Sequence, residues 1–344
     1  MYAFKVSREK VLIPLLCMTL LALMLLSLVI GRYPVSPQEA FQMLFAAPFG
    51  GQPEVQDNKW IVINILRLPR ILLVFMAGLG LGAAGAALQG VFRNPLVGPE
   101  ILGVLSGAAF GGVLALFFGF VKLPQVMTFA FTFGLGALIL AFILAGAARQ
   151  QGTIGLVLAG IIIGGLFAAM TGLLTYLADA ETKLPNIVYW LMGSFASATY
   201  EQVVFMAAVT IVVLTPLLGL SWRINILSLG DTDAMSLGVK IKTLRWSVLA
   251  LVSLLVSAQV AVSGGVGWVG LIMPHLARML IGPDHTRLLP VSALLGGIYL
   301  LLMDNLARSL TAGEIPIGLL TSMVGTPVFA FFFIKLRGKG WSND

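Results

Sequence analysis

Long apolar runs dominate the sequence, and their length most limits how the chain can fold. A helix of about 20 apolar residues crosses the hydrocarbon core of a bilayer. Ten such runs follow one another along the chain, at about residues 11–30, 70–91, 99–121, 125–148, 153–177, 200–221, 245–263, 264–281, 289–307 and 316–335. We therefore predict an all-α polytopic membrane protein with about ten transmembrane helices.

The composition supports this fold class. The chain is 59% hydrophobic and 10% charged, whereas soluble domains are about 25% charged. Its single cysteine, Cys17, cannot form an intrachain disulfide bond. These features exclude a disordered chain, a secreted disulfide scaffold and nearly every soluble enzyme fold. Because no polar stretch is long enough to form a soluble domain, residues 1–344 are predicted to form a single transmembrane domain.

The distribution of basic residues predicts the orientation. With the N-terminus placed inside, 14 of the 21 Lys and Arg residues fall in inner segments and 7 in outer segments. Cytoplasmic loops carry such an excess, so both termini are predicted to be cytoplasmic. The first apolar run resembles a signal peptide, but residues 31–34 offer no small-residue cleavage site. We therefore expect it to be retained as the first helix.

Two long loops and one short apolar segment interrupt this pattern. The outer loop covers residues 31–69 and the inner loop residues 223–243. Apolar residues within the inner loop predict short helices that lie against a partner at the inner surface. The segment 187–198 is too short to span the bilayer, so we expect an interfacial or re-entrant helix there.

A glycine pattern in the second apolar run needs to be distinguished from a nucleotide site. Gly80, Gly82 and Gly85 match the GxGxxG string of dinucleotide-binding folds. That motif requires a preceding strand and a polar helix start, and both are missing in this apolar run. Gly78, Gly82 and Ala86 instead form a small-residue face, which is typical of close helix packing in membranes.

The sequence shows no energy source of its own. It contains neither a Walker A motif nor HExxH, and few ionisable residues fall within the apolar runs, namely Asp304, His275 and Arg278. Ion-driven transporters usually carry intramembrane carboxylates on their ion pathways. An ion-driven secondary transporter and a polytopic membrane enzyme remain the alternatives to a transport subunit without catalytic residues, cofactor or metal site.

Several motifs carry a family resemblance. They are the strings Arg67-Leu-Pro-Arg70, NPLVGP at 94–99, VGLIMPH at 269–275, GPDH at 282–285 and EIPIG at 314–318. In this order and spacing, the chain resembles the permease subunits of ATP-binding-cassette (ABC) importers for iron–siderophore, haem and vitamin B12, a FecCD-like group of type II importers.

The resemblance implies a set of partners and a cargo. A homodimer of this permease is expected in the bacterial inner membrane, in contact with membrane lipids and without nucleic acid. Two cytoplasmic ATPase subunits would hold ATP and magnesium, and a periplasmic binding protein would deliver the substrate. The expected cargo is an iron chelate, as ferric siderophore or haem, or cobalamin.

The resemblance also places two functional elements. The inner segment Ser228–Val239 is expected to seat on each ATPase subunit, with Asp231, Ala234, Leu237 and Gly238 as coupling residues. A loop folded back onto its own bundle is the alternative. The fifth predicted helix is expected to line the translocation path, with helix packing as the alternative role. Its candidate residues are Gly160, Gly164, Met170 and Leu173.

Three outer arginines oppose the positive-inside bias. Arg67 and Arg70 flank Pro69, a residue favoured in the first turn of a helix, and Arg308 lies at the outer end of the ninth predicted helix. In a dimer they would place six cations around the entrance. The resemblance implies that they dock acidic residues of the binding protein. Binding lipid phosphates or capping helix ends are the alternatives.

Overall fold

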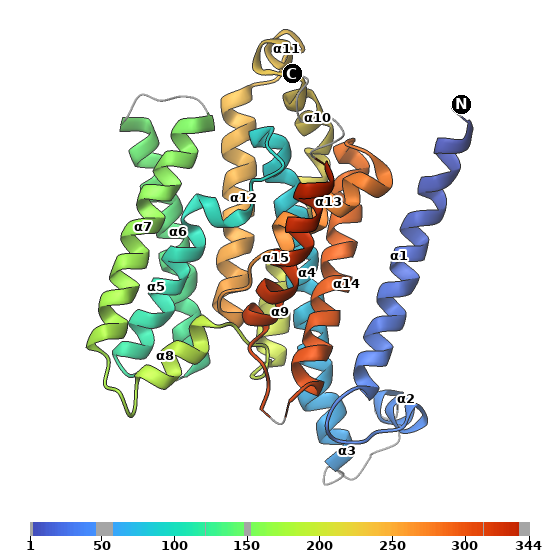
Figure 1. Cartoon of the computed structure of the whole chain (residues 1–344), viewed down its shortest axis with the longest axis vertical. Coiled ribbons are helices and arrows are strands. Elements are labelled where there is room, and N and C mark those ends of the chain that lie inside the picture. Colours follow the sequence, from blue (N-terminus) through green and yellow to red (C-terminus); the bar gives the residue numbers. More distant parts are fainter. Residues whose placement is uncertain (1–2, 46–57, 121, 148–152, 312, 337–344) are drawn as a thin grey trace.

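The computed structural model describes residues 3–45, 58–120, 122–147, 153–311 and 313–336, and in these ranges it contains helices and no strands. The helices run side by side in one bundle (Figure 1). They are α1 (Ala3–Val29), α2 (Pro37–Phe45), α3 (Asn58–Trp60), η1 (Ile61–Arg67), α4 (Leu68–Phe92), η2 (Pro99–Leu102), α5 (Val104–Phe117), α6 (Leu123–Ala147), α7 (Thr153–Leu177), α8 (Leu184–Leu191), α9 (Tyr200–Gly219), α10 (Ser221–Leu229), α11 (Asp231–Ser236), α12 (Ile241–Ser263), α13 (Val269–Ile281), α14 (His285–Ser309) and α15 (Ile317–Leu336).

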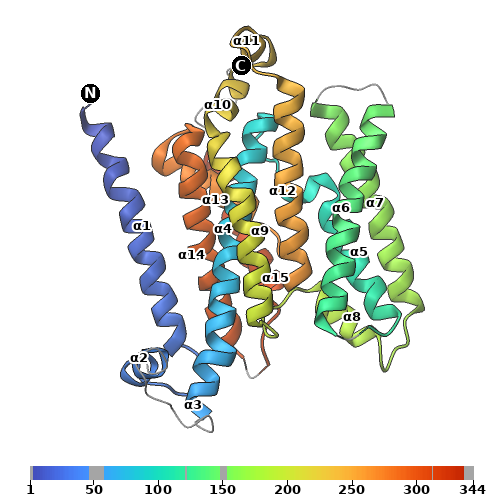
Figure 2. The same ribbon diagram turned by 180° about the vertical axis from the view of Figure 1, so that it is seen from behind.

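The predicted fold class is confirmed. Within the described residues, seven helical segments are long and apolar enough to cross a membrane, and α5, α13 and α15 are shorter apolar helices. Together they occupy the positions of the ten predicted runs. The first helix begins, and the last described helix ends, at the end of the bundle that carries α11 (Figures 1 and 2). This arrangement agrees with an even number of crossings.

The outer loop predicted at 31–69 is partly helical. It contains α2, and from Asn58 onward the chain is helical through η1 into α4, whereas residues 46–57 lie outside the described ranges. Pro69 lies in the first turn of the α-helix α4, as predicted, and η1 makes the helix continuous before it. A proline ring crowds the carbonyl four residues earlier, and the preceding π-helical turn, in which Leu68 N donates to Ile63 O, widens the helix at this point.

Two predicted spans are shorter than expected because the backbone breaks near their starts. Gly103 has a φ of +73°, so the third predicted helix divides into η2 and α5. Gly264 has a φ of +69° and Trp268 a φ of +70°, which delays α13 until Val269. The apolar pattern alone gives no sign of these breaks, because left-handed residues do not interrupt hydrophobicity.

The helix α4 lies at the centre of the bundle, and its glycines bring neighbouring backbones into contact. Most of α4 is buried. A Cβ atom at Gly78 would overlap the backbone of Gly296 in α14, and one at Gly82 would overlap the carbonyl of Ser292. Gly85 approaches the carbonyl of Gly270 in α13 in the same way. The GxGxxG string is therefore a packing surface, as predicted.

This packing predicts that Gly85→Ala destabilises the protein. The new methyl group would overlap a backbone carbonyl, and overpacking of this kind costs about 1–3 kcal/mol. The control Gly136→Ala, in α6, adds a methyl group where no atom lies within 4 Å. It should leave stability unchanged or raise it. Thermal unfolding in detergent measures both, and equal midpoints for the two variants would contradict the packing role.

Candidate functional site

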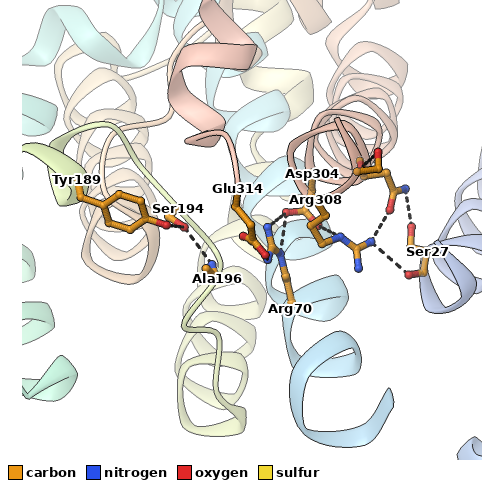
Figure 3. A network of polar contacts seen from close by, with 10 residues as sticks. Ser27, Arg70, Tyr189, Ser194, Ala196, Asp304, Arg308 and Glu314 are labelled. Atoms are coloured by element: carbon orange, nitrogen blue, oxygen red, sulfur yellow. Dashed lines mark hydrogen bonds and ion pairs between the residues drawn. The ribbon is translucent and has the colours of Figure 1, made fainter. Parts of the chain in front are cut away.

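The end of the bundle opposite α11, which was predicted to face outward and is called the outer end below, carries a buried network centred on Arg70 (Figure 3). Its Nε donates to Asp304 Oδ1 at 2.9 Å, and its Nη1 donates to the two carboxylate oxygens of Glu314 at 2.7 and 2.9 Å. The Asp304 side chain is 1% exposed and that of Glu314 is 31% exposed. Arg70 therefore joins α4 to α14 and to the segment that precedes α15.

Arg308 extends this network to the first helix. Its Nε lies 3.2 Å from Asp304 Oδ2, and its Nη2 donates to the backbone oxygen of Ser27 at 3.2 Å and to Asn305. The Asn305 amide in turn donates to Ser27 Oγ at 2.7 Å. Asp304 thus lies between two guanidinium groups, which compensates its charge inside an apolar bundle.

Arg67 has a different set of partners. It donates to the backbone oxygens of Leu28 at 2.6 Å, Val29 at 3.2 Å and Tyr33 at 2.6 Å. The contacts with Leu28 and Val29 satisfy carbonyls at the end of α1 that have no partner within the helix. Capping of a helix end, one of the two alternatives named for these arginines, is therefore observed at Arg67.

All three outer arginines are largely buried. Arg67, Arg70 and Arg308 are only 5–6% exposed, because in-chain oxygens surround their guanidinium groups. They nevertheless line one outer cavity of about 210 Å³, together with Arg32 and Glu314. Their role in docking a binding protein stays a prediction.

The opposite end of the bundle carries the short helices α10 and α11. They form within Ser228–Val239 and just before it, as the apolar pattern predicts, and α11 extends beyond the ends of the long helices (Figures 1 and 2). Leu229, Met235 and Leu237 are 60–64% exposed. Gly238 has a φ of +78°, a left-handed conformation that favours glycine.

Polar contacts anchor this element to three long helices. Asp231 Oδ1 accepts from Arg245 in α12 at 2.7 Å and from Arg93, at the end of α4, at 3.1 Å. Asn225 in α10 donates to Asp284 Oδ1 at 2.6 Å, and its own oxygen accepts from the backbone N of His285 at 2.7 Å. The element is thus held against α4, α12 and α14.

The pKa of Asp284, one of these anchors, has opposing physical causes. Burial alone raises the pKa of the Asp284 carboxyl, but hydrogen bonds from Asn225 and Thr286 outweigh it and leave the pKa below its ordinary value. Asp284 therefore remains ionised as the N-cap of α14.

The predicted coupling residues differ in exposure, and Ala234 is fully buried. Of the four predicted coupling residues, Asp231 and Ala234 contact the bundle, whereas the side chain of Leu237 is exposed.

The four predicted path residues do not lie on one face of α7. Gly160 and Gly164 are buried, and a Cβ atom at Gly160 would overlap the carbonyl of Ile101 in η2. Met170 and Leu173 are 37% and 57% exposed. The glycines therefore have the packing role named as their alternative. A role of Met170 and Leu173 in lining the path stays a prediction.

The sequence analysis did not predict which residues pair with the outer arginines or anchor the α10–α11 element. The sequence analysis noted Asp304 and Glu314 separately, but Arg70 and Asp304 are 234 residues apart, and no motif links them. The available signal was the arginines themselves, because buried cations require nearby carboxylates or carbonyls. Asn225 gave no signal, since an asparagine in a polar loop has no distinctive pattern.

Comparison with known proteins identifies the family. The FecCD transport family matches residues 19–335. The chain belongs to the FecCD transport family, whose members are membrane transport components rather than enzymes. The molybdate import system permease protein MolB of Haemophilus influenzae is 48% identical, over 93% of this chain and 94% of that protein.

Other relatives are named for different transported substrates. The cobalamin import system permease protein BtuC of Halobacterium salinarum is 38% identical, over 88% of this chain and 80% of its own length. The hemin transport system permease protein HmuU of Yersinia pestis is 39% identical, over 82% and 85%. A solved structure reported as a metal-chelate type ABC transporter in an inward-facing conformation is 46% identical, with a TM-score of 0.85 over 94% of this chain and 99% of that chain.

The outer network predicts that Asp304→Asn destabilises the protein. The variant would leave Arg70 and Arg308 buried without the carboxylate between them, and removing one partner of a buried pair costs about 3–5 kcal/mol. The comparison variant Glu314→Gln changes a more exposed carboxylate, so its loss should be smaller. Chemical unfolding in detergent ranks the two, and a larger loss for Glu314→Gln would contradict this ordering.

Proposed function

We propose that the chain is the membrane-spanning subunit of an ABC importer of the bacterial inner membrane, with both termini cytoplasmic. It works as a homodimer with two cytoplasmic ATPase subunits, which bind ATP and magnesium, and with a periplasmic binding protein. Membership of the FecCD family supports an ABC permease. The observation that carries the proposal is the projecting α10–α11 element, with apolar side chains exposed and its base anchored.

The anchors suggest how ATPase motion reaches the membrane. A subunit that grips Leu229, Met235 and Leu237 pulls on a short element that Asp231 and Asn225 hold to the long helices. Closure of the ATPase pair on ATP would thus tilt each permease half as a body. A path along the dimer axis would then open to alternate sides of the membrane.

The cargo proposal has two classes. The sequence motifs resemble importers of iron chelates and cobalamin, and the BtuC and HmuU relatives support that class. A molybdate-type oxyanion is the second candidate, because the molybdate permease is 48% identical whereas those two relatives are 38% and 39% identical. Binding of molybdate, ferric siderophore, haem and cobalamin to the partner binding protein decides between the classes.

The coupling proposal predicts that Leu237→Glu lowers transport per ATP hydrolysed by at least several fold. A charge on an exposed apolar contact would be desolvated at the ATPase interface, which is unfavourable. Leu310→Glu is the matched control, since Leu310 is 57% exposed at the opposite end of the bundle and Leu237 is 61% exposed. Proteoliposomes with the complete complex measure both rates.

The outcome separates the proposed function from its alternatives. An unchanged ratio of transport to hydrolysis in Leu237→Glu would contradict the coupling role. Transport driven by a proton gradient in proteoliposomes without the ATPase would instead establish an ion-driven secondary transporter. If the Leu237→Glu variant elutes as an intact dimer in size-exclusion chromatography, a lower ratio of transport to hydrolysis does not result from disassembly.

The docking proposal predicts that Glu314→Gln strengthens binding of the loaded binding protein. Glu314 neutralises Arg70, so an incoming carboxylate must compete with it, and Arg–carboxylate pairs are bidentate and specific. Glu201→Gln, which removes another outer carboxylate from α9, controls for net charge. Affinity is measured at low and high salt, since screening weakens such pairs. Equal affinities for the two variants would contradict docking through Arg70.

A further inference from the structure

A second cavity lies at the inner end of the bundle, beside the α10–α11 element, whose Asp231 and Met235 are among its lining residues. Its volume is about 520 Å³, and it lies between the end of α6, the start of α7, α11 and the start of α12. Three basic residues line it: Lys240, Lys242 and Arg245. Leu156, Ile241 and Trp246 provide apolar walls.

The cavity lies at the boundary of the predicted membrane spans. The span of α6 ends at Ala147, that of α7 begins at Ile154, and that of α12 begins at Ile241. These ends lie beside one another at the α11 end of the bundle (Figures 1 and 2). Hydrocarbon gives way to phospholipid headgroups at this level. Trp246 packs edge-to-face on Phe142, and such rings are enriched at this interface.

The charges in the cavity favour an anion. Asp231 is the only acidic residue among the described lining residues. Its Oδ1 already accepts from Arg93 and Arg245, so its negative charge is compensated. Lys240 and Lys242 are exposed, and Arg245, only 6% exposed, keeps a buried Nε without a hydrogen-bond partner among the described residues. The start of α12 adds backbone N–H groups that favour negative charge.

We propose that this cavity binds the phosphate headgroup of an anionic phospholipid from the inner leaflet. Lys240 and Lys242 would contact the phosphate, and Arg245 would offer its unused Nε. The apolar walls would cover the first part of the acyl chains, which a free oxyanion lacks. Basic pockets between helices at the cytoplasmic surface bind anionic headgroups for the same electrostatic reason.

A lipid bound in this cavity would also affect the α10–α11 element. Arg245 holds Asp231 at the start of α11, so a phosphate that approaches the same guanidinium group contacts a residue that anchors α11. The lipid would therefore bind beside the element that the ATPase is proposed to contact. The site itself depends neither on the cargo nor on the ATPase.

Intact-mass spectrometry of the purified full-length permease in detergent tests this site. The probes are phosphatidylglycerol and phosphatidylcholine with identical acyl chains, titrated separately without ATPase. Phosphatidylglycerol should bind at least tenfold more tightly. The double variant Lys240→Gln/Lys242→Gln should lose that preference. The control Lys10→Gln/Arg223→Gln removes two exposed basic residues that do not line the cavity, and it should retain the preference.

Each other outcome overturns the proposal. Equal binding of the two lipids to the wild type shows that the headgroup is not recognised, and this comparison needs no variant to fold. Equal losses in both double variants show a general charge effect. Displacement of phosphatidylglycerol by millimolar inorganic phosphate shows that the cavity binds a free oxyanion instead of a lipid.

Discussion

The direct contact between the backbones of α4 and α14 is the constraint on which the rest of the structure depends. Gly78 and Gly82 face Gly296 and Ser292 so closely that no side chain fits between them. In a bilayer, helix association has no hydrophobic drive and relies on close packing. Glycine makes this packing possible, and many backbone atoms are then in contact along both helices. The pair can move as one body but cannot easily slide.

Both ends of this pair carry the polar networks. At the outer end, Arg70 of α4 pairs with Asp304 of α14. At the inner end, Gly90 of α4 packs against His285 of α14, and Asn225 joins α10 to the same helix start. The packed pair of helices therefore connects the α10–α11 element to the outer network. Mechanical continuity between the two membrane faces follows from this geometry.

The sequence predicted the number and position of the apolar helices because hydrophobic length is a local property. It also predicted the packing role of Gly82, because small residues spaced four apart lie on one face of a helix. The breaks at Gly103 and Trp268 were missed, because both lie inside runs that are apolar enough overall to predict continuous helices. The partners of Arg70 were missed for another reason, since they are brought together only when α4, α14 and the segment before α15 pack.

The charges of the buried outer arginines are compensated mainly by oxygen atoms of the same chain. Two carboxylates serve Arg70 and Arg308, and backbone oxygens serve Arg67, so the network is largely compensated within one chain. Asp304 is inaccessible, whereas Glu314 is partly exposed in the short segment before α15. The backbone of Ile317 and Gly318 donates to Gly193 and Met192, at the end of α8. Of the two carboxylates, only Glu314 can therefore be displaced from Arg70 by an external carboxylate. Its displacement would also shift the start of α15 and the end of α8, which are hydrogen-bonded to each other.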